Sequence, residues 1–116
     1  MKNRDEMVLC LLIENCQEIT DALNRFEIKN FVDFNNDPVI KRAVTMCLIS
    51  ISETTKLFTD DFRKKHDYIN FKVFKAMRNI AAHKYGSVNF EMVWEIASRE
   101  IPLYHNMFNK LLKQIK

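Results

Sequence analysis

Glycine and proline are scarce in this sequence, with one Gly and two Pro among 116 residues. Tight turns draw heavily on these two residue types, so a fold of many strands joined by tight turns is excluded. The shortage favours a few long helices joined by short loops. Hydrophobic residues make up 47% and charged residues 28% of the chain, which is typical of a globular protein. The length predicts one domain over residues 1–116.

Paired cysteines and long apolar runs are also missing. The three cysteines are an odd number without a CxxC pair, and each lies in or beside an apolar stripe: Cys10, Cys16 and Cys47. This pattern predicts a reduced chain in the cytoplasm. The apolar run at residues 7–13 is too short to span a bilayer, and no small-residue cleavage site follows it. We therefore expect no membrane anchor and no export signal.

Apolar residues at spacings of three and four predict a first helix over residues 5–25, whereas residues 27–36 lack this period. Asp37 and Pro38 predict the start of a second helix that runs to about residue 58. The Asp37 side chain can cap the free amides, and Pro38 suits the first helical position. Since the second helix is apolar on more than one side, we expect it to be buried against the core, with another subunit as a further candidate neighbour.

The second half of the chain predicts further helices after a polar connector at residues 59–68, and a short turn of helix within this connector stays open. Asn70 can cap a third helix over residues 71–85, and Gly86 lies where a left-handed closing residue is usually needed. A fourth helix begins near residue 89, Pro102 is expected to break or kink it, and a last segment spans residues 103–115. The sum is an all-α, antiparallel up-and-down bundle of four to five helices without strands.

The third helix has two contrasting sides. About 100° per residue places apolar residues on one side: Val73, Phe74, Met77, Ile80 and Ala81. The opposite side is polar and cationic: Lys72, Lys75, Asn79 and His83. Arg78 and Tyr85 lie together on the flank of that polar side. Such a combination of a guanidinium, an imidazole and an amide on one helix is a candidate for chemistry on an anionic substrate.

These side chains suit RNA cleavage without a metal ion or cofactor. The Arg fork matches phosphate oxygens, and His can transfer a proton near neutral pH. Residues 71–89 contain no Asp or Glu, so we expect no local Mg²⁺ site. The 2′-OH of RNA can then act as the nucleophile while Arg stabilises charge on the phosphorus oxygens. The net charge of +3 is compatible with an anionic partner without requiring one.

One His per third helix is too few for a reaction that profits from both a base and an acid. Arg78 and His83 also lie about 140° apart around an ideal helix, so they converge poorly within one chain. A two-fold homodimer that pairs two such helices would supply both groups twice. The residues therefore predict a homodimer with a shared site.

The stretch that carries these residues reads Arg78-Asn79-Ile80-Ala81-Ala82-His83-Lys84-Tyr85. Its form, Arg, four residues, His, any residue, Tyr, resembles the signature of the HEPN superfamily in its HepT-like branch. The resemblance covers most of the chain, including Asp37-Pro38, Ser52-Glu53, Val93-Trp94 and Ile101-Pro102. It implies a homodimer with a cleft between paired signature helices. It also implies a metal-independent endoribonuclease that acts as the toxin of a type VII-like toxin–antitoxin pair.

The resemblance further implies roles for individual residues. Arg78 and His83 match the catalytic pair, Asn79 matches a supporting polar residue, and Tyr85 matches the Tyr that a partner nucleotidyltransferase antitoxin modifies with AMP. The added bulk and negative charge would block RNA phosphate. We also expect Glu53 to order the third helix by bonding to Arg78 or to backbone amides.

Basic side chains along the same stretch are predicted to bind RNA phosphates: Lys72, Lys75 and Lys84. An alternative stays open from the sequence. In it, the same cleft holds a nucleotide or RNA without cutting it, and the chain is a helical partner subunit of a nucleotidyltransferase.

Overall fold

The computed structural model describes residues 3–82 and 87–115, and these ranges contain helices and loops but no strand. The helices follow one another in this order: α1 (Arg4–Arg25), α2 (Phe31–Asn35), α3 (Pro38–Thr55), α4 (Asp60–Lys65), α5 (Lys72–Ala82), α6 (Phe90–Glu95), the π-helical turn η2 (Ile96–Glu100) and α7 (Ile101–Ile115). The predicted all-α fold class is confirmed for this part of the chain. The homodimer stays a prediction.

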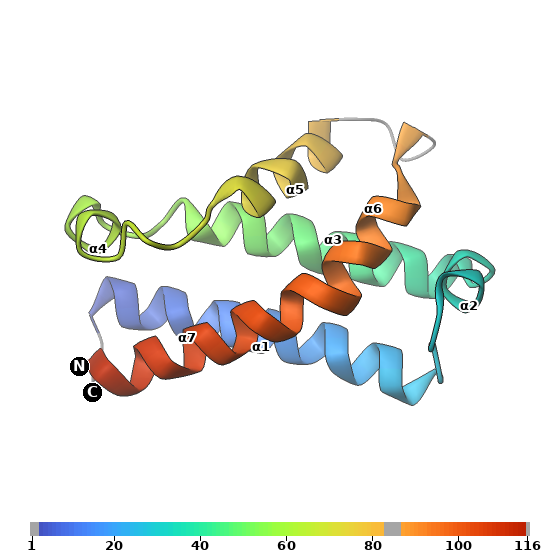
Figure 1. The fold of residues 1–116 in the computed structure, drawn as a ribbon, viewed down its shortest axis with the longest axis horizontal. Helices are drawn as coiled ribbons and strands as arrows, with labels where there is room; N and C mark the ends of the chain where they lie inside the picture. Colours follow the sequence, from blue (N-terminus) through green and yellow to red (C-terminus); the bar gives the residue numbers. More distant parts are fainter. Residues whose placement is uncertain (1–2, 83–86, 116) are drawn as a thin grey trace.

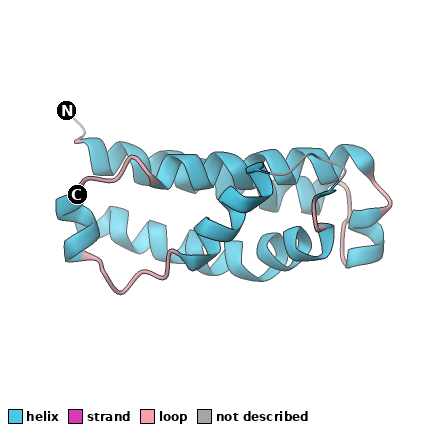
Figure 2. Ribbon diagram, turned by 90° about the horizontal axis from the view of Figure 1, so that it is seen from above, coloured by secondary structure: helices cyan, strands magenta, loops and turns pink. Residues whose placement is uncertain are grey.

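The long helices run back and forth along one axis (Figure 1). α1 packs against α3 and α7, and α5 packs against α3. Figure 1 shows that the two helices of each packed pair run in opposite directions. The view from above in Figure 2 shows the same elongated bundle. The antiparallel up-and-down arrangement is therefore confirmed. Among the described helices, none combines the length and the apolar character needed to cross a bilayer.

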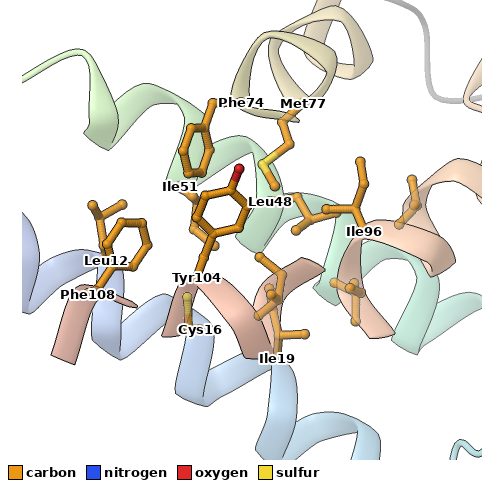
Figure 3. Packing of buried hydrophobic residues seen from close by; sticks show 14 of the residues in the cluster. Leu12, Cys16, Ile19, Leu48, Ile51, Phe74, Met77, Ile96, Tyr104 and Phe108 are labelled. Carbon is orange, nitrogen blue, oxygen red and sulfur yellow. The ribbon is translucent and has the colours of Figure 1, made fainter. Parts of the chain in front are cut away.

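The core lies where the apolar sides of the long helices meet (Figure 3). Its fully or almost fully buried side chains include Leu12 and Cys16 from α1, Leu48 and Ile51 from α3, Phe74 and Met77 from α5, and Phe108 from α7. Burial of such side chains is the main favourable term in folding. Phe26, which follows the end of α1, is 54% exposed and lies outside this core.

Three predicted helix starts are confirmed by the side chains that cap them. Asp37 Oδ1 accepts hydrogen bonds from the backbone N–H groups of Val39 at 3.0 Å and Ile40 at 3.1 Å. Asn70 Oδ1 accepts from the N–H of Lys72 at 3.0 Å. Asn89 Oδ1 accepts from the N–H of Met92 at 3.2 Å. Capping therefore fixes where α3, α5 and α6 begin.

Several predicted boundaries need correction. α3 ends at Thr55 rather than near residue 58. The stretch at residues 27–36 contains the short helix α2, capped by Asn30. The sequence did not predict this helix because five residues are too few to display a helical period. The polar connector contains the short helix α4, capped by Thr59, so the turn of helix that the sequence left open is present. The expected end of the third helix and Gly86 lie outside the described residues.

Pro102 disturbs the last helix without ending it. The backbone N–H of Ile101 bonds to the carbonyl of Ile96, five residues back, so the turn before the proline is widened into a π-helical turn. A widened turn relieves the clash between a proline ring and the preceding turn. A separate last segment from residue 103 was therefore a wrong expectation, because α7 begins at Ile101 and continues the helical path of α6 and η2.

Candidate functional site

α5 presents one apolar and one polar side, as predicted. Phe74, Met77 and Ile80 are buried. The polar residues of the helix are exposed: Lys72, Lys75, Arg78 and Asn79. Four of the predicted site residues therefore share one accessible side of a single helix, while the opposite side is fixed in the core.

Aromatic packing holds α5 in place. The Phe74 ring lies 4.7 Å from the ring of Tyr104 and 6.3 Å from that of Phe108, centroid to centroid. The Tyr104 hydroxyl also donates a hydrogen bond of 2.6 Å to the backbone carbonyl of Asn70, the residue that caps α5. The start of α5 and its first buried ring are thus tied to the same residue of α7, which limits sliding of the helix.

A second tie joins the start of α5 to the end of α3. Arg63 of α4 donates a hydrogen bond of 2.7 Å to the carbonyl of Thr55, and its guanidinium carbon lies 5.4 Å from the centroid of the Phe71 ring. A cation near an aromatic face is attracted by the ring quadrupole. α5 therefore carries its polar side chains on a well-supported frame.

The polar side of α5 has one sign of charge. Within the described ranges, no carboxylate pairs with Arg78, Lys72 or Lys75. An exposed guanidinium without a carboxylate partner keeps all of its donors available for an anion such as a phosphate. His83, Lys84 and Tyr85, which the sequence assigns to the same site, lie outside the described residues.

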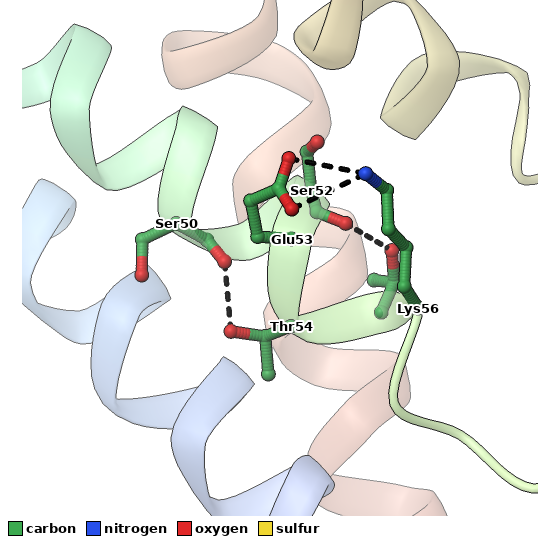
Figure 4. Close-up of polar contacts among 6 residues, drawn as sticks. Ser50, Ser52, Glu53, Thr54 and Lys56 are labelled. Atoms are coloured by element: carbon green, nitrogen blue, oxygen red, sulfur yellow. Dashed lines mark hydrogen bonds and ion pairs between the residues drawn. The ribbon is translucent and has the colours of Figure 1, made fainter. Parts of the chain in front are cut away.

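Glu53 does not make the contact that the sequence suggested. Its carboxylate oxygens both lie 3.2 Å from Nζ of Lys56, the residue directly after the end of α3 (Figure 4). The side chain is exposed, so this ion pair is of the surface type that adds little stability. The expected bond to Arg78 was wrong for the part of the chain that the structure describes. The reason is that an exposed carboxylate needs no buried partner, and a lysine three residues away is within reach.

His66 lies apart from α5's polar side. It is 8% exposed, its ring is 4.4 Å from that of Phe62, and its Nδ1 is 3.1 Å from the Tyr68 hydroxyl. Burial, reinforced by the charge of Lys65, lowers the pKa of His66. This histidine is therefore a packed structural residue. Over residues 3–82 and 87–115, no three His, Cys, Asp or Glu side chains gather closely enough to hold a metal ion.

Sequence reasoning missed a small cavity of about 150 Å³ next to the polar side of α5. Its walls come from the end of α5 and from the segment that leads into α6: Asn79, Ile80, Ser87, Val88, Asn89 and Met92. The sequence identified Asn89 only as a residue near the start of a helix. The sequence does contain two amides, Asn79 on α5 and Asn89 before α6, that could have suggested a shared site. Whether these two side chains lie close together depends on the tertiary packing, which the sequence pattern does not give.

A family profile described as "Ribonuclease HepT-like" matches residues 12–111. Two proteins of Methanocaldococcus jannaschii named "Putative RNase MJ1216" and "Putative RNase MJ0125" are 34% and 33% identical to the chain. Each alignment covers 100% of this chain, with 94% and 98% of the respective relative.

A third relative comes from Thermococcus cleftensis and is named "Probable ribonuclease HepT". It is 31% identical over 102 residues, which are 87% of this chain and 93% of the relative. No solved structure matches the chain. The matched region includes α5 and its polar side.

Proposed function

The chain belongs to the HepT-like ribonuclease family, and we propose that it is a ribonuclease that cuts RNA with Arg78 and His83. One structural observation supports this assignment above the others. Arg78 stands exposed on a firmly packed helix, with no carboxylate partner among the described residues. A guanidinium in that state is available to stabilise negative charge on a phosphate.

The proposed reaction is an in-line transesterification that needs no metal ion. The 2′-oxygen of one ribose attacks the adjacent phosphorus, and the bond from phosphorus to the 5′-oxygen of the next nucleotide breaks. One imidazole accepts the proton of the 2′-OH, and a second protonates the departing 5′-oxygen. Arg78 stabilises the charge that grows on the non-bridging oxygens. Water can hydrolyse the resulting cyclic phosphate in a second step.

Two imidazoles at one phosphate require two copies of the chain, so we propose a two-fold homodimer in which both α5 helices border one cleft. A dimer of one wild-type and one His83→Ala subunit keeps only one imidazole at the shared phosphate. An excess of His83→Ala subunits that exchange into the wild-type dimer should therefore suppress cleavage by the wild-type subunits. Sedimentation that shows only monomer at micromolar concentration would contradict this arrangement.

Lys72, Lys75 and Lys84 are proposed to guide the RNA strand by attraction to its phosphates. Asn79 is proposed to support the site as a polar neighbour of Arg78. Glu53 has no part in this proposal, since its carboxylate pairs with Lys56.

The cellular role that we propose is that of a toxin whose antitoxin is a nucleotidyltransferase. The enzyme would transfer AMP from ATP to the Tyr85 hydroxyl with release of pyrophosphate, and the added phosphate would repel RNA. Mass spectrometry after incubation with the purified partner and ATP should show added AMP units. Tyr85→Phe should show none, because it lacks the acceptor oxygen.

The proposed activity is tested by incubating the purified protein with RNA in EDTA. Wild type should cut, His83→Ala should lose about 10²-fold or more of the rate, and His105→Ala, a control on α7, should cut like wild type. RNA that stays intact with wild type would contradict the ribonuclease assignment. If RNA then still binds, the chain is the non-cutting partner subunit that the sequence left as an alternative.

A further inference from the structure

The cavity beside α5 has a lining that differs from the rest of the polar side. Three of its residues are apolar (Ile80, Val88 and Met92), and three carry uncharged polar groups (Asn79, Ser87 and Asn89). None of these described lining residues is a lysine, an arginine or a carboxylate. They offer a phosphate no charge partner, whereas a flat, uncharged ring with polar edges could bury its faces against them and bond at its rim.

The two amides have hydrogen-bonding groups to spare. Asn89 Oδ1 accepts from the N–H of Met92, which fixes the oxygen of this amide and leaves its NH₂ group as a pair of donors. The Asn79 side chain is exposed, and its amide forms no hydrogen bond to another described residue. The cavity therefore offers donors and an acceptor from opposite walls.

Size narrows the class of ligand. At about 150 Å³, the cavity is well below the roughly 300–1,000 Å³ of pockets that hold drug-sized molecules. One nucleobase is an uncharged, planar ring system on that smaller scale. Asparagine amides also pair with adenine in two hydrogen bonds, to its N6 and N7 edge.

Position connects the cavity to the proposed cut. Asn79 follows Arg78 on α5, and the two exposed side chains point about 100° apart around the helix. A nucleotide whose base lies against the Asn79 amide would have to cross this part of the helix surface to place a phosphate at the Arg78 guanidinium. Ser87 and Asn89 close the cavity from the segment before α6.

We propose that this cavity is a base-reading subsite, which holds one nucleobase of the RNA beside the phosphate to be cut and prefers adenine. Asn79 and Asn89 read the edge of the base, and Ile80, Val88 and Met92 contact its face. This inference rests on the proposed ribonuclease function, because it assigns the sequence preference of that same site. It gives the enzyme a rule for where along an RNA strand it cuts.

A binding measurement tests the subsite without any cutting. In ¹⁵N NMR spectra, millimolar AMP should shift the side-chain amide signals of Asn79 and Asn89, and CMP should shift them at least several-fold less. Asn89→Ser is the informative variant, since serine can still cap α6 but has no amide to offer the base. It should abolish most of the Asn79 shift. Equal shifts with all four nucleoside monophosphates, or none, would overturn the proposal.

A cleavage measurement then tests the preference itself. Sequencing the ends produced from an RNA pool with random positions should show adenine enriched several-fold at one fixed place next to the cut. Asn89→Ser should bring that enrichment close to one, while Asn109→Ser, a remote control on α7, should keep it. An enrichment that persists in Asn89→Ser would overturn the proposal.

The two measurements separate the subsite from the proposed function. If wild type cuts no RNA while AMP still shifts both amides and Asn89→Ser removes the effect, the ribonuclease function fails and the base site stands. The opposite outcome is that wild type cuts RNA, but the amide signals shift equally with every nucleotide and no base is enriched next to the cut. In that case the subsite fails and the ribonuclease function stands.

Discussion

α1 and α5 make an informative comparison, because both pack an apolar side against α3 and expose a polar side. The exposed side of α1 includes three acidic residues: Glu14, Glu18 and Asp21. Two of them already have neighbours, since Gln17 Nε2 donates to Asp21 Oδ1 at 2.9 Å and Cys47 Sγ lies 3.8 Å from Glu18 Oε2. The exposed side of α5 carries only cations and an amide.

The difference shows which part of an amphipathic helix determines its role. The inward sides of both helices obey the same rule of apolar packing, so they determine the fold and say little about chemistry. The outward sides differ in sign of charge and in the presence of partners. An RNA strand would be repelled by the outward side of α1 and attracted to that of α5, where donors are unoccupied.

The largest expected effect on stability comes from the inward side of α5. Phe74→Ala should lower the free energy of unfolding by about 3–5 kcal/mol, because the Phe74 ring is buried and packs on two aromatic rings of α7. Urea denaturation followed by circular dichroism measures the loss. Leu103→Ala is the control, since Leu103 is 66% exposed and should change stability little. A loss below about 1 kcal/mol for Phe74→Ala would show that α5 is not anchored as described.

The next effect concerns the outward side. Lys72→Gln and Lys75→Gln should each weaken RNA binding and reduce the slope of log affinity against log salt by about 0.7. Fluorescence anisotropy with a labelled single-stranded RNA at several salt concentrations measures both. Lys110→Gln and Lys113→Gln are the controls, because they remove exposed charges from α7 instead of α5. They should leave the slope unchanged. Equal losses from both helices would mean that RNA binds without regard to α5.

The buried hydroxyl of Ser52 on α3 predicts a smaller change in stability. Ser52 is 0% exposed, and its Oγ has no hydrogen-bond partner within the described part of the chain. Ser52→Ala should raise the free energy of unfolding by about 1 kcal/mol, because it removes an unpaired polar group and favours the helix. Ser50→Ala, on the exposed side of the same helix (Figure 4), isolates the helix-propensity part. Equal gains from both variants would show that the Ser52 hydroxyl costs nothing.

The smallest expected effect is a dependence of stability on pH. Burial and the charge of Lys65 lower the pKa of His66 in the folded chain, and Asp5 opposes part of that change. The unfolded chain therefore binds a proton at this histidine more readily than the folded chain. Unfolding free energy should fall as the pH drops below about 6.5. His66→Phe should flatten this decline between pH 7 and pH 5 in urea denaturation, and an unchanged slope would contradict the assignment.

The sequence could predict the parts of this molecule that depend on local rules. The caps at Asp37 and Asn70, the start of a helix near residue 89 and the two sides of α5 follow from residue types at fixed spacings, and the structure confirms them. The partner of Glu53 and the cavity next to Asn79 could not be predicted, since both depend on which side chains long-range packing brings together. The placement of His83 and Tyr85 stays a prediction.

Activity of two arginine variants tests the central claim most directly, because Arg78 lies on the outward side of α5 and Arg25 lies at the exposed end of α1. Single-turnover cleavage of one RNA in EDTA should slow by about 10²–10³-fold in Arg78→Ala, the typical cost of removing one group that stabilises transition-state charge. Arg25→Ala should cut at the wild-type rate. Equal rates for Arg78→Ala and wild type, or equal losses in both variants, would contradict the claim that α5 bears the cutting site.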